Sequence, residues 1–203
     1  YKSDLGIGVR LHDLKDEFCM FVMAYEPYVK NDTNAHVTIS SWRRIDDNVI
    51  PARGKVAGAY ANSALIKTDA NRAGFDEAIV LDNHGHVSEG SAMNIFMLRD
   101  GVLVTPPITD NILEGITRRS IIEVARKELG IEIVERSIDR TEVFIAEEMF
   151  MTGTAAQVVA ITKVDHRSVG MGSMGPVTTK LRNAFDDIVR AKNPKYASWN
   201  VEV

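Results

Sequence analysis

The sequence predicts a mixed α/β fold of the α+β kind, in which strands and hairpins pack against amphipathic helices. Short apolar stretches bounded by turn residues recur along the chain, and three longer stretches repeat apolar residues at helical spacing. The two kinds of stretch do not alternate regularly, which argues against an array of βαβ units. With 203 residues, 45% of them hydrophobic, the chain can form one large domain, or one domain and part of another.

The first third of the chain is expected to consist mainly of strands. Leu5 to Leu11 is short and punctuated by glycine, and Glu17 to Ala24 is a continuous apolar run, typical of a strand buried on both faces. Cys19 lies inside this run and is expected to be buried and structural. Residues 25–34 predict a loop or linker, after which His36 to Ser41 alternates as a strand does.

A helix and several short strands are expected next. Lys55 to Ala73 repeats alanine and leucine at helical spacing, and Gly74 follows it as a typical stop signal. The strands predicted after it, separated by turns at residues 83–86 and 99–101, are Glu77 to Asp82, Asn94 to Leu98 and Val102 to Val104.

The last part of the chain predicts two more amphipathic helices. Gly115 to Leu129 and Pro176 to Lys192 each place their apolar residues on one face. The elements expected between them are a strand at Ile131 to Glu135, a short helix at Thr141 to Glu148, and strands at Met149 to Thr152 and Val158 to Val164.

Composition excludes several classes of partner. The net charge of −4 is spread along the chain and gives no basic face for nucleic acid. The single cysteine excludes an internal disulfide framework and suits a reducing cytoplasm. No apolar run approaches the roughly 20 residues that span a membrane, and the start shows no signal-peptide pattern. We therefore expect a cytoplasmic protein without nucleic-acid or membrane partners.

Two charged residues are candidates for chemistry. Lys55 lies at the predicted start of the first helix, where the helix dipole disfavours an ammonium group and favours a nucleophilic amine. A solvated surface lysine is the alternative. Glu89 follows a turn and precedes the strand at Asn94, where its carboxylate could pair with a ring nitrogen of a cofactor. An exposed loop glutamate is the alternative.

Two stretches of small and polar residues could bind an anion. Gly115 precedes the second helix and allows close approach of a ligand, and the free amides there, with the Thr117 hydroxyl, would suit a phosphate. An ordinary helix cap is the alternative. Thr152 to Ala156 follows an apolar strand and could expose backbone amides to a carboxylate or phosphate. A tight loop is the alternative.

Two other patterns indicate no site. Residues 170–175 match the glycine spacing of dinucleotide-binding loops, but no buried strand precedes them and no strand ending in an acid follows. His84 and His86 could suggest a metal, yet no other histidine or cysteine cluster supports them, since zinc sites use three or four ligands. We interpret both histidines as turn residues and expect no metal.

Taken together, these features resemble the class IV (fold-type IV) pyridoxal-phosphate aminotransferases over essentially the whole chain. The residues that match the signature region of the family, with fitting spacing, are Glu89, Ser91, Asn94 to Phe96, Leu103, Thr105, Leu113 and Gly115 to Arg118. The branched-chain subgroup is indicated by Ser40 to Trp42, Ile50-Pro51, Lys55 to Gly58, Tyr60, Asn62-Ser63, Thr105 to Pro107, Gly153 to Ala156 and Gly175 to Thr178. The resemblance implies a pseudo-barrel with surrounding helices.

The resemblance implies pyridoxal 5′-phosphate as the cofactor and gives each candidate residue a role. Lys55 is the catalytic lysine, which bonds the cofactor covalently and then moves a proton. Glu89 pairs with the pyridine nitrogen, and Tyr60 donates a hydrogen bond to the phenolic oxygen of the ring. The other implied contacts are Leu113 on the ring face, Gly115, Ile116, Thr117 and Thr154 around the phosphate, and Thr154 with Ala155 at the substrate carboxylate.

The implied reaction is transamination of leucine, isoleucine or valine with 2-oxoglutarate, which gives branched 2-oxo acids and glutamate. The implied partners are these small molecules and further copies of the chain, in a homodimer or higher homo-oligomer. Three alternatives stay open. Aminodeoxychorismate lyases and D-amino acid transaminases share the fold, and an inactive fragment is the third possibility.

Two departures from the family pattern bear on this interpretation. The smaller N-terminal domain of the family, which supplies an arginine to the phosphate, is mostly absent. We expect residues 1–25 to be its remnant, residues 26–35 to be the linker, and residues 36–203 to form the large cofactor-binding domain. Ala92-Met93 stands where the family often has Gly-Glu near the substrate, which bears on the side-chain preference.

Overall fold

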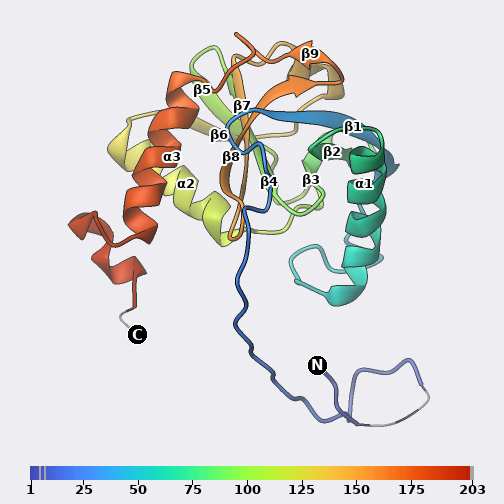
Figure 1. Ribbon diagram of the computed structural model, residues 1–203. Coiled ribbons are helices and arrows are strands. Elements are labelled where there is room, and N and C mark those ends of the chain that lie inside the picture. Colours follow the sequence, from blue (N-terminus) through green and yellow to red (C-terminus); the bar gives the residue numbers. More distant parts are fainter. Residues whose placement is uncertain (5, 7, 202–203) are drawn as a thin grey trace.

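The computed structural model describes residues 1–4, 6 and 8–201, and Figure 1 shows a curled β-sheet flanked by helices. Nine strands of the described residues form this sheet, in the order β3-β2-β1-β8-β7-β4-β5-β6, with β9 paired to β8. Both parallel and antiparallel pairs occur, which confirms the mixed fold. The strands are β1 Ala35–Arg43, β2 Glu77–Leu81, β3 Val87–Gly90, β4 Asn94–Arg99, β5 Val102–Thr105, β6 Ile133–Glu135, β7 Glu148–Gly153, β8 Gln157–Val164 and β9 Arg167–Ser168.

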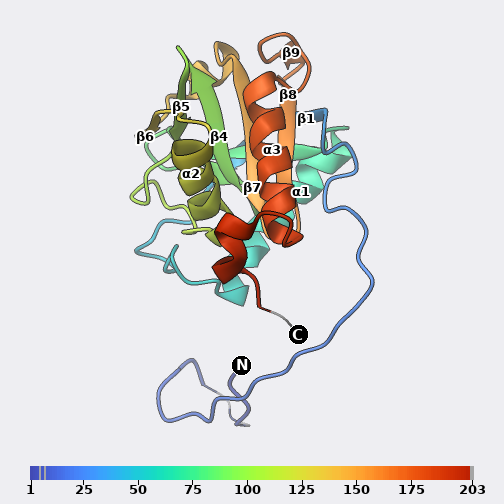
Figure 2. The same cartoon turned by 90° about the vertical axis from the view of Figure 1, so that its left-hand side faces the viewer.

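The helices cover the outside of the sheet in two groups. Helix α1 packs on β1 and β2, whereas α2 and α3 pack on β7 and each other, as Figure 2 shows from the side. The α-helices are α1 Tyr60–Arg72, α2 Ile116–Glu128 and α3 Pro176–Val189. Short 3-10 helices occur at η1 Ala57–Ala59, η2 Arg140–Phe144 and η3 Pro194–Trp199.

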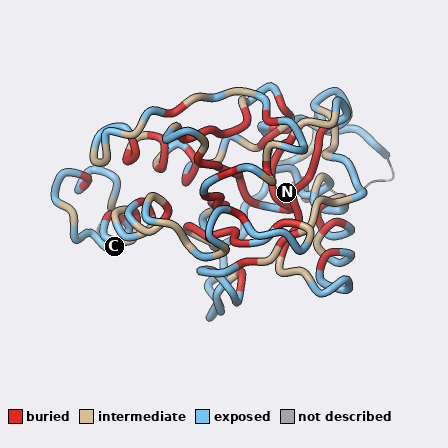
Figure 3. The backbone as a smooth tube through the Cα atoms, turned by 90° about the horizontal axis from the view of Figure 1, so that it is seen from above, coloured by how far each residue is buried: buried red, intermediate tan, exposed pale blue. Residues whose placement is uncertain are grey.

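The central strands bury both of their faces. In β7, Met149 and Met151 point into the core inside the curled sheet, whereas Phe150 points outward toward α2 and α3. Phe150 stacks there on Phe96 of β4, with ring centroids 4.9 Å apart. In Figure 3 the buried segments gather in the interior of the body, whereas many of the outer loops are exposed. Because side chains alternate between two buried faces, these strands are continuous apolar runs in the sequence.

Three stretches differ from their predicted structure. The helix expected from Lys55 begins at Tyr60, after the 3-10 turn η1, so Lys55 lies in the preceding loop. Glycines in this stretch have low helix propensity, which is consistent with the later start. The helix expected at Thr141 to Glu148 is only the 3-10 helix η2, because Glu148 already belongs to β7. The stretch between the turn at residues 83–86 and Asn94, for which no strand was predicted, contains strand β3, in which Glu89 lies.

The apolar run near the N-terminus differs most from its predicted structure. Glu17 to Ala24 forms no strand, and its side chains are exposed, with Phe18 85% and Val22 96% accessible. Cys19 is likewise exposed rather than buried. This segment extends away from the body in Figures 1 and 2, and none of the described residues covers it. An apolar run forms a buried strand only where another element packs on it.

The first predicted strand is not formed in the described part of the chain. The strand expected at Leu5 to Leu11 includes residues 5 and 7, which lie outside the described residues, and residues 8–11 form no strand. As for membrane spans, no helix in the described part of the chain is long and apolar enough to cross a bilayer.

Candidate active site

A cavity of about 600 Å³ opens at one edge of the sheet. Strands β1, β3 and β7 end there, and β4, α1 and α2 begin there. The structure brings together in its lining all the residues that the sequence analysis singled out for the cofactor or substrate, namely Lys55, Tyr60, Glu89, Leu113, Gly115, Ile116, Thr117, Thr154 and Ala155. Residues that are distant in the sequence therefore share one concave surface, the usual form of a small-molecule site.

Glu89 is a buried carboxylate in the cavity wall, with a side chain only 4% exposed. Its Oε1 lies 2.9 Å from Nη2 of Arg44, and its Oε2 accepts hydrogen bonds from Asn94 Nδ2 at 3.0 Å and from the Leu113 amide at 3.1 Å. Burial raises the pKa of Glu89 to about 7, whereas Arg44, the Leu113 amide and Lys55 act in the opposite direction. The carboxylate is therefore held in place beside a space where a further cation would stabilise its charge.

Asn94 connects Glu89 to the loop before α2. Its Nδ2 also donates to the carbonyl oxygen of Leu113, at 2.8 Å. A Cβ atom at Gly115 would clash with Oδ1 of Asn94, so only glycine fits where the loop passes this side chain. The contact fixes the start of α2 against the wall that carries Glu89.

The N-terminus of α2 presents free backbone amides to the cavity. Gly115 is the N-cap residue and supplies no side-chain cap. The amide of Arg119 bonds to the Gly115 carbonyl at 3.0 Å, but no partner among the described residues accepts from the amides of Ile116 and Thr117. Both residues line the cavity. A helix end of this kind favours an anion, because the free amides and the helix dipole act together.

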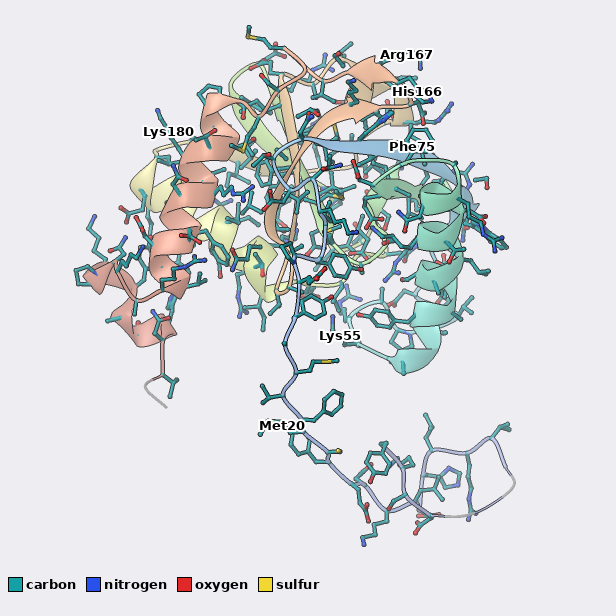
Figure 4. All side chains as sticks on the ribbon, in the orientation of Figure 1. Met20, Lys55, Phe75, His166, Arg167 and Lys180 are labelled. Atoms are coloured by element: carbon teal, nitrogen blue, oxygen red, sulfur yellow. The ribbon has the colours of Figure 1, made fainter. Side chains whose placement is uncertain are left out.

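Lys55 lies at the rim of the cavity, in the loop before α1. Its side chain forms no hydrogen bond or ion pair with the described residues, and Nζ lies 5.6 Å from the ring centroid of Tyr60. Figure 4 shows Lys55 at the lower end of the body, beside the first turn of α1. Since α1 begins only at Tyr60, its dipole does not act on Lys55 in the way that the sequence predicted.

The turn between β7 and β8 closes another side of the cavity. Thr154 and Ala155 are exposed in this turn, and the buried Oγ1 of Thr152 has no hydrogen-bond partner among the described residues. Met93 is buried and lines the same cavity beside Ala92, so the departure from the family's Gly-Glu pair does face this space.

The structure also shows why the glycine-rich stretch at residues 170–175 offers no anion site. It leads into α3, but the carboxylate of Glu148 already accepts hydrogen bonds from the amides of Val177 and Thr178, at 3.0 and 2.7 Å. The Thr178 hydroxyl donates to the same carboxylate at 2.7 Å. A group of the chain itself thus occupies the N-terminus of α3.

Sequence reasoning missed two residues that organise the cavity. Arg44 follows β1, and nothing in the local sequence marks it, because its partner Glu89 lies on another strand. Asn94 carried a signal only as part of the family signature, and its two hydrogen bonds link Glu89 and Leu113. The contacts in the folded chain identify Arg44 and Asn94 as residues that organise the cavity.

The model of the family described as "Amino-transferase class IV" matches residues 3–164, and the chain belongs to this family.

Within the family, the chain is similar to branched-chain-amino-acid aminotransferases. It is 44% identical to the probable branched-chain-amino-acid aminotransferase of Aquifex aeolicus, over 98% of this chain and 64% of that relative. The T.th. branched-chain amino acid aminotransferase in complex with N-(5′-phosphopyridoxyl)-L-glutamate has a TM-score of 0.79 and 44% identity, with coverage of 82% of this chain and 56% of that chain. The holo-form of the enzyme from Thermobaculum terrenum has a TM-score of 0.82 and 38% identity, with coverage of 86% and 57%. The chain thus spans less than two thirds of the length of these relatives.

Proposed function

We propose that this chain holds pyridoxal 5′-phosphate and exchanges amino groups between branched-chain amino acids and 2-oxoglutarate. One observation carries the proposal. A single cavity collects the amine of Lys55, the buried carboxylate of Glu89 and the N-terminus of α2, whose first amides have no partner among the described residues. The phosphopyridoxyl adduct of one similar structure and the holo-form of another support the same cofactor for this chain.

The residues of the cavity fit the cofactor. The amides of Ile116 and Thr117 suit a phosphate because they have no partner in the described part of the chain, and the Thr154 hydroxyl lies in the same lining. Tyr60 lines the cavity and would donate its phenol hydroxyl to the ring oxygen, and Leu113 would supply an apolar contact for the ring face. When bound, pyridoxal phosphate supplies an electron sink for the carbanion that amino-group transfer requires.

Lys55 would serve as the covalent anchor and as the base that moves the substrate proton. No ion pair with the described residues holds the Lys55 amine, whose Nζ lies 5.6 Å from the ring centroid of Tyr60, so its side chain can turn toward a bound cofactor. Its position at the rim lets Nζ reach the substrate side of the cavity, next to Tyr60.

Glu89 would face the ring nitrogen. Arg44, Asn94 and the Leu113 amide fix both of its carboxylate oxygens, so the group is oriented before any ligand binds. Because burial raises the pKa of Glu89 to about 7, a protonated nitrogen placed beside it would favour the carboxylate form. The carboxylate would in turn keep that nitrogen protonated.

The substrate carboxylate would be held by the turn that contains Thr154 and Ala155, whose backbone borders the same cavity. The buried Met93 makes the neighbouring wall apolar, which suits an aliphatic side chain. The names of the similar proteins favour branched-chain substrates over the same-fold lyase and D-amino acid transaminase activities.

The exposed apolar run near the N-terminus bears on the domain organisation. Residues 1–25 would belong to the smaller domain of the family, residues 26–35 to the linker, and residues 36–203 to the large domain. The exposed apolar side chains of Phe18, Phe21 and Val22 support this division, because such a run needs a covering element. Hydrogen exchange on the full-length protein would then show protected amides in this run, and free exchange there would contradict the division.

The assembly and location follow from the resemblance. A homodimer or higher homo-oligomer in the cytoplasm is the expected state, and the single cysteine of the chain is compatible with a reducing compartment. Light scattering on the purified protein measures the mass of the particle, and a monomer at working concentration would contradict the dimer.

Borohydride reduction of the full-length protein with pyridoxal phosphate, followed by peptide mapping, tests the cofactor assignment. We expect a phosphopyridoxyl group on Lys55, absent in Lys55→Ala and retained in Lys180→Ala, whose exposed lysine lies on α3 far from the cavity. The Lys55→Ala variant should also form glutamate from leucine and 2-oxoglutarate at least about 10³-fold more slowly than the wild type. A label on another lysine would reject this role for Lys55, and pyruvate release from aminodeoxychorismate without glutamate formation would favour the lyase.

A further inference from the structure

A second cluster of ionisable side chains lies outside the cavity, at the opposite end of β3 from Glu89. Asp82 follows β2, His86 precedes β3, and Asp110 lies in the loop between β5 and α2. One ligand atom of each residue lies within 4.8 Å of the others. We propose that Asp82, His86 and Asp110 bind a divalent transition-metal cation.

Hydrogen bonds that involve the backbone position the three residues of the cluster. Oδ1 of Asp82 accepts from the amides of His84 and His86, both at 2.9 Å, which closes the turn and returns His86 to the side of Asp82. The Asp82 amide donates to the His86 carbonyl oxygen at 2.8 Å. On the other side, the Ser88 hydroxyl donates to the carbonyl oxygen of Asp110 at 2.6 Å. The backbone positions of Asp82, His86 and Asp110 are therefore fixed by hydrogen bonds within the fold.

The charges of the cluster are unbalanced. Asp82 is 3% exposed and Asp110 is 7% exposed, yet no lysine or arginine forms an ion pair with either carboxylate among the described residues. The Oδ2 atom of Asp110 is buried and has no hydrogen-bond partner in the described part of the chain. Buried carboxylates are ordinarily paired, hydrogen-bonded or bound to a metal. A cation between them would satisfy both the charge and the orphaned oxygen.

The ligand chemistry selects the kind of cation. One imidazole nitrogen and two carboxylate oxygens suit zinc or manganese, because imidazole favours transition metals and carboxylates are good ligands for divalent ions. Three protein ligands leave room for water in the coordination sphere. Asp139 lies near His86, with Oδ1 3.5 Å from Nε2, and would hold the imidazole from outside.

The position of the cluster indicates what a bound cation would do. None of its three residues lines the cavity, so the metal would take no part in the chemistry there. However, β3 runs from this cluster to Glu89, and the loop that carries Asp110 continues to Leu113 and Gly115. The cation would join β3 to the loop before α2 and would stabilise these two segments of the cavity wall.

Zinc titration of the chelator-treated protein, followed by calorimetry and thermal unfolding, tests the site independently of the aminotransferase activity. We expect one equivalent of Zn²⁺ to bind, and free Zn²⁺ at about 100 times Kd to raise the unfolding midpoint by about 5–10 °C. His86→Ala and Asp110→Asn should each weaken binding at least about tenfold. Mn²⁺ serves as a second probe with lower affinity for thiols.

His84→Ala is the matched control, because this histidine lies in the same turn but outside the cluster. It should bind Zn²⁺ as the wild type does. The His86 side chain is 38% exposed, so its removal leaves the fold intact even where Asp110→Asn does not fold.

Two outcomes would overturn the proposal. Equal binding by the wild type and His86→Ala would place the metal elsewhere, for example on the exposed Cys19. Absence of Zn²⁺ binding to the wild type would exclude the metal site. Greater stability of Asp110→Asn would then indicate a proton shared by the two carboxyl groups instead.

Discussion

Helices α2 and α3 begin in the same way, yet only one of them offers its N-terminus to a ligand. Each has a glycine N-cap in extended conformation, Gly115 or Gly175, and a threonine in the first turn. At α3, the carboxylate of Glu148 occupies the amides, whereas at α2 the amides face the cavity. The difference teaches that a helix end binds an external anion only where no carboxylate of the chain reaches it first.

The largest expected effect concerns the occupied helix end. Glu148→Ala removes three hydrogen bonds to a buried carboxylate and should lower the free energy of unfolding by about 4 kcal/mol. Cofactor affinity of the folded variant should not change. Denaturant unfolding and cofactor titration measure the two quantities. The neighbouring Glu147→Ala, at an exposed position, should cost about 1 kcal/mol or less, and equal losses in both variants would break the comparison.

The open end can be examined through the pH dependence of Glu89, the buried carboxylate nearest to it in the cavity. Its pKa is raised from 4.5 to about 7, so between these values the folded protein holds a proton that the unfolded chain releases. The corresponding stability is complete below pH 4.5 and is lost as the pH rises to about 7, and it amounts to about 3 kcal/mol.

Denaturant unfolding without cofactor, from pH 4.5 to 8, measures this loss against Glu89→Gln, which cannot titrate. The free energy of unfolding of the wild type should decrease with pH by about 3 kcal/mol more than that of the variant. Bound cofactor should abolish this decrease. Parallel curves for the two proteins would show that Glu89 has an ordinary pKa in the folded state.

A pair of glycine variants compares the two helix ends directly. A Cβ atom at Gly115 would clash with Asn94, and one at Gly175 would clash with Glu148, so both alanine variants should lose about 2 kcal/mol of stability. Only Gly115→Ala should weaken pyridoxal phosphate binding, by at least about tenfold, because only this helix end faces the cavity. A similar loss of affinity in Gly175→Ala, measured by absorbance titration, would contradict the assignment.

The smallest effect is expected for the two threonines. Thr117→Val should weaken cofactor binding by about 1 kcal/mol, through loss of one hydroxyl at the open end. Thr178→Val should instead lower the stability by about 1 kcal/mol, since its hydroxyl donates to Glu148. Isothermal titration and thermal unfolding of both variants separate these outcomes. Loss of cofactor affinity in Thr178→Val, with loss of stability alone in Thr117→Val, would contradict the roles assigned to the two helix ends.

Much of the fold could be predicted from local patterns. The runs that became β4, β7 and β8 are apolar because both faces of these strands are buried, and the periodic stretches became α2 and α3 close to their expected bounds. The segment from Glu17 to Ala24 is similarly apolar but forms no strand, because strand formation also requires a covering partner, which local sequence does not show.

The candidate site divides in the same manner. Lys55, Glu89 and the stretch from Leu113 to Thr117 were identified from their residue types and spacing, and the structure places them in one cavity. Arg44 could not be identified, because its importance comes from the ion pair with Glu89 across two strands. The cluster at His86 was dismissed for lack of ligands, and its carboxylates become neighbours only in the folded chain.

Local sequence was enough to predict most of the central strands, the amphipathic helices α2 and α3, the family resemblance and the residues that could hold a cofactor, because periodicity, turn residues and motif spacing are local properties of a chain. The tertiary structure alone decided which helix end stays open, how Glu89 is buried against Arg44, and which acids meet at His86. Those outcomes depend on contacts between residues that are far apart in the chain. The fold, and not the local sequence, decides which polar and charged groups are buried next to one another, and burial and neighbouring charges in turn set their pKa values and their ability to bind a ligand.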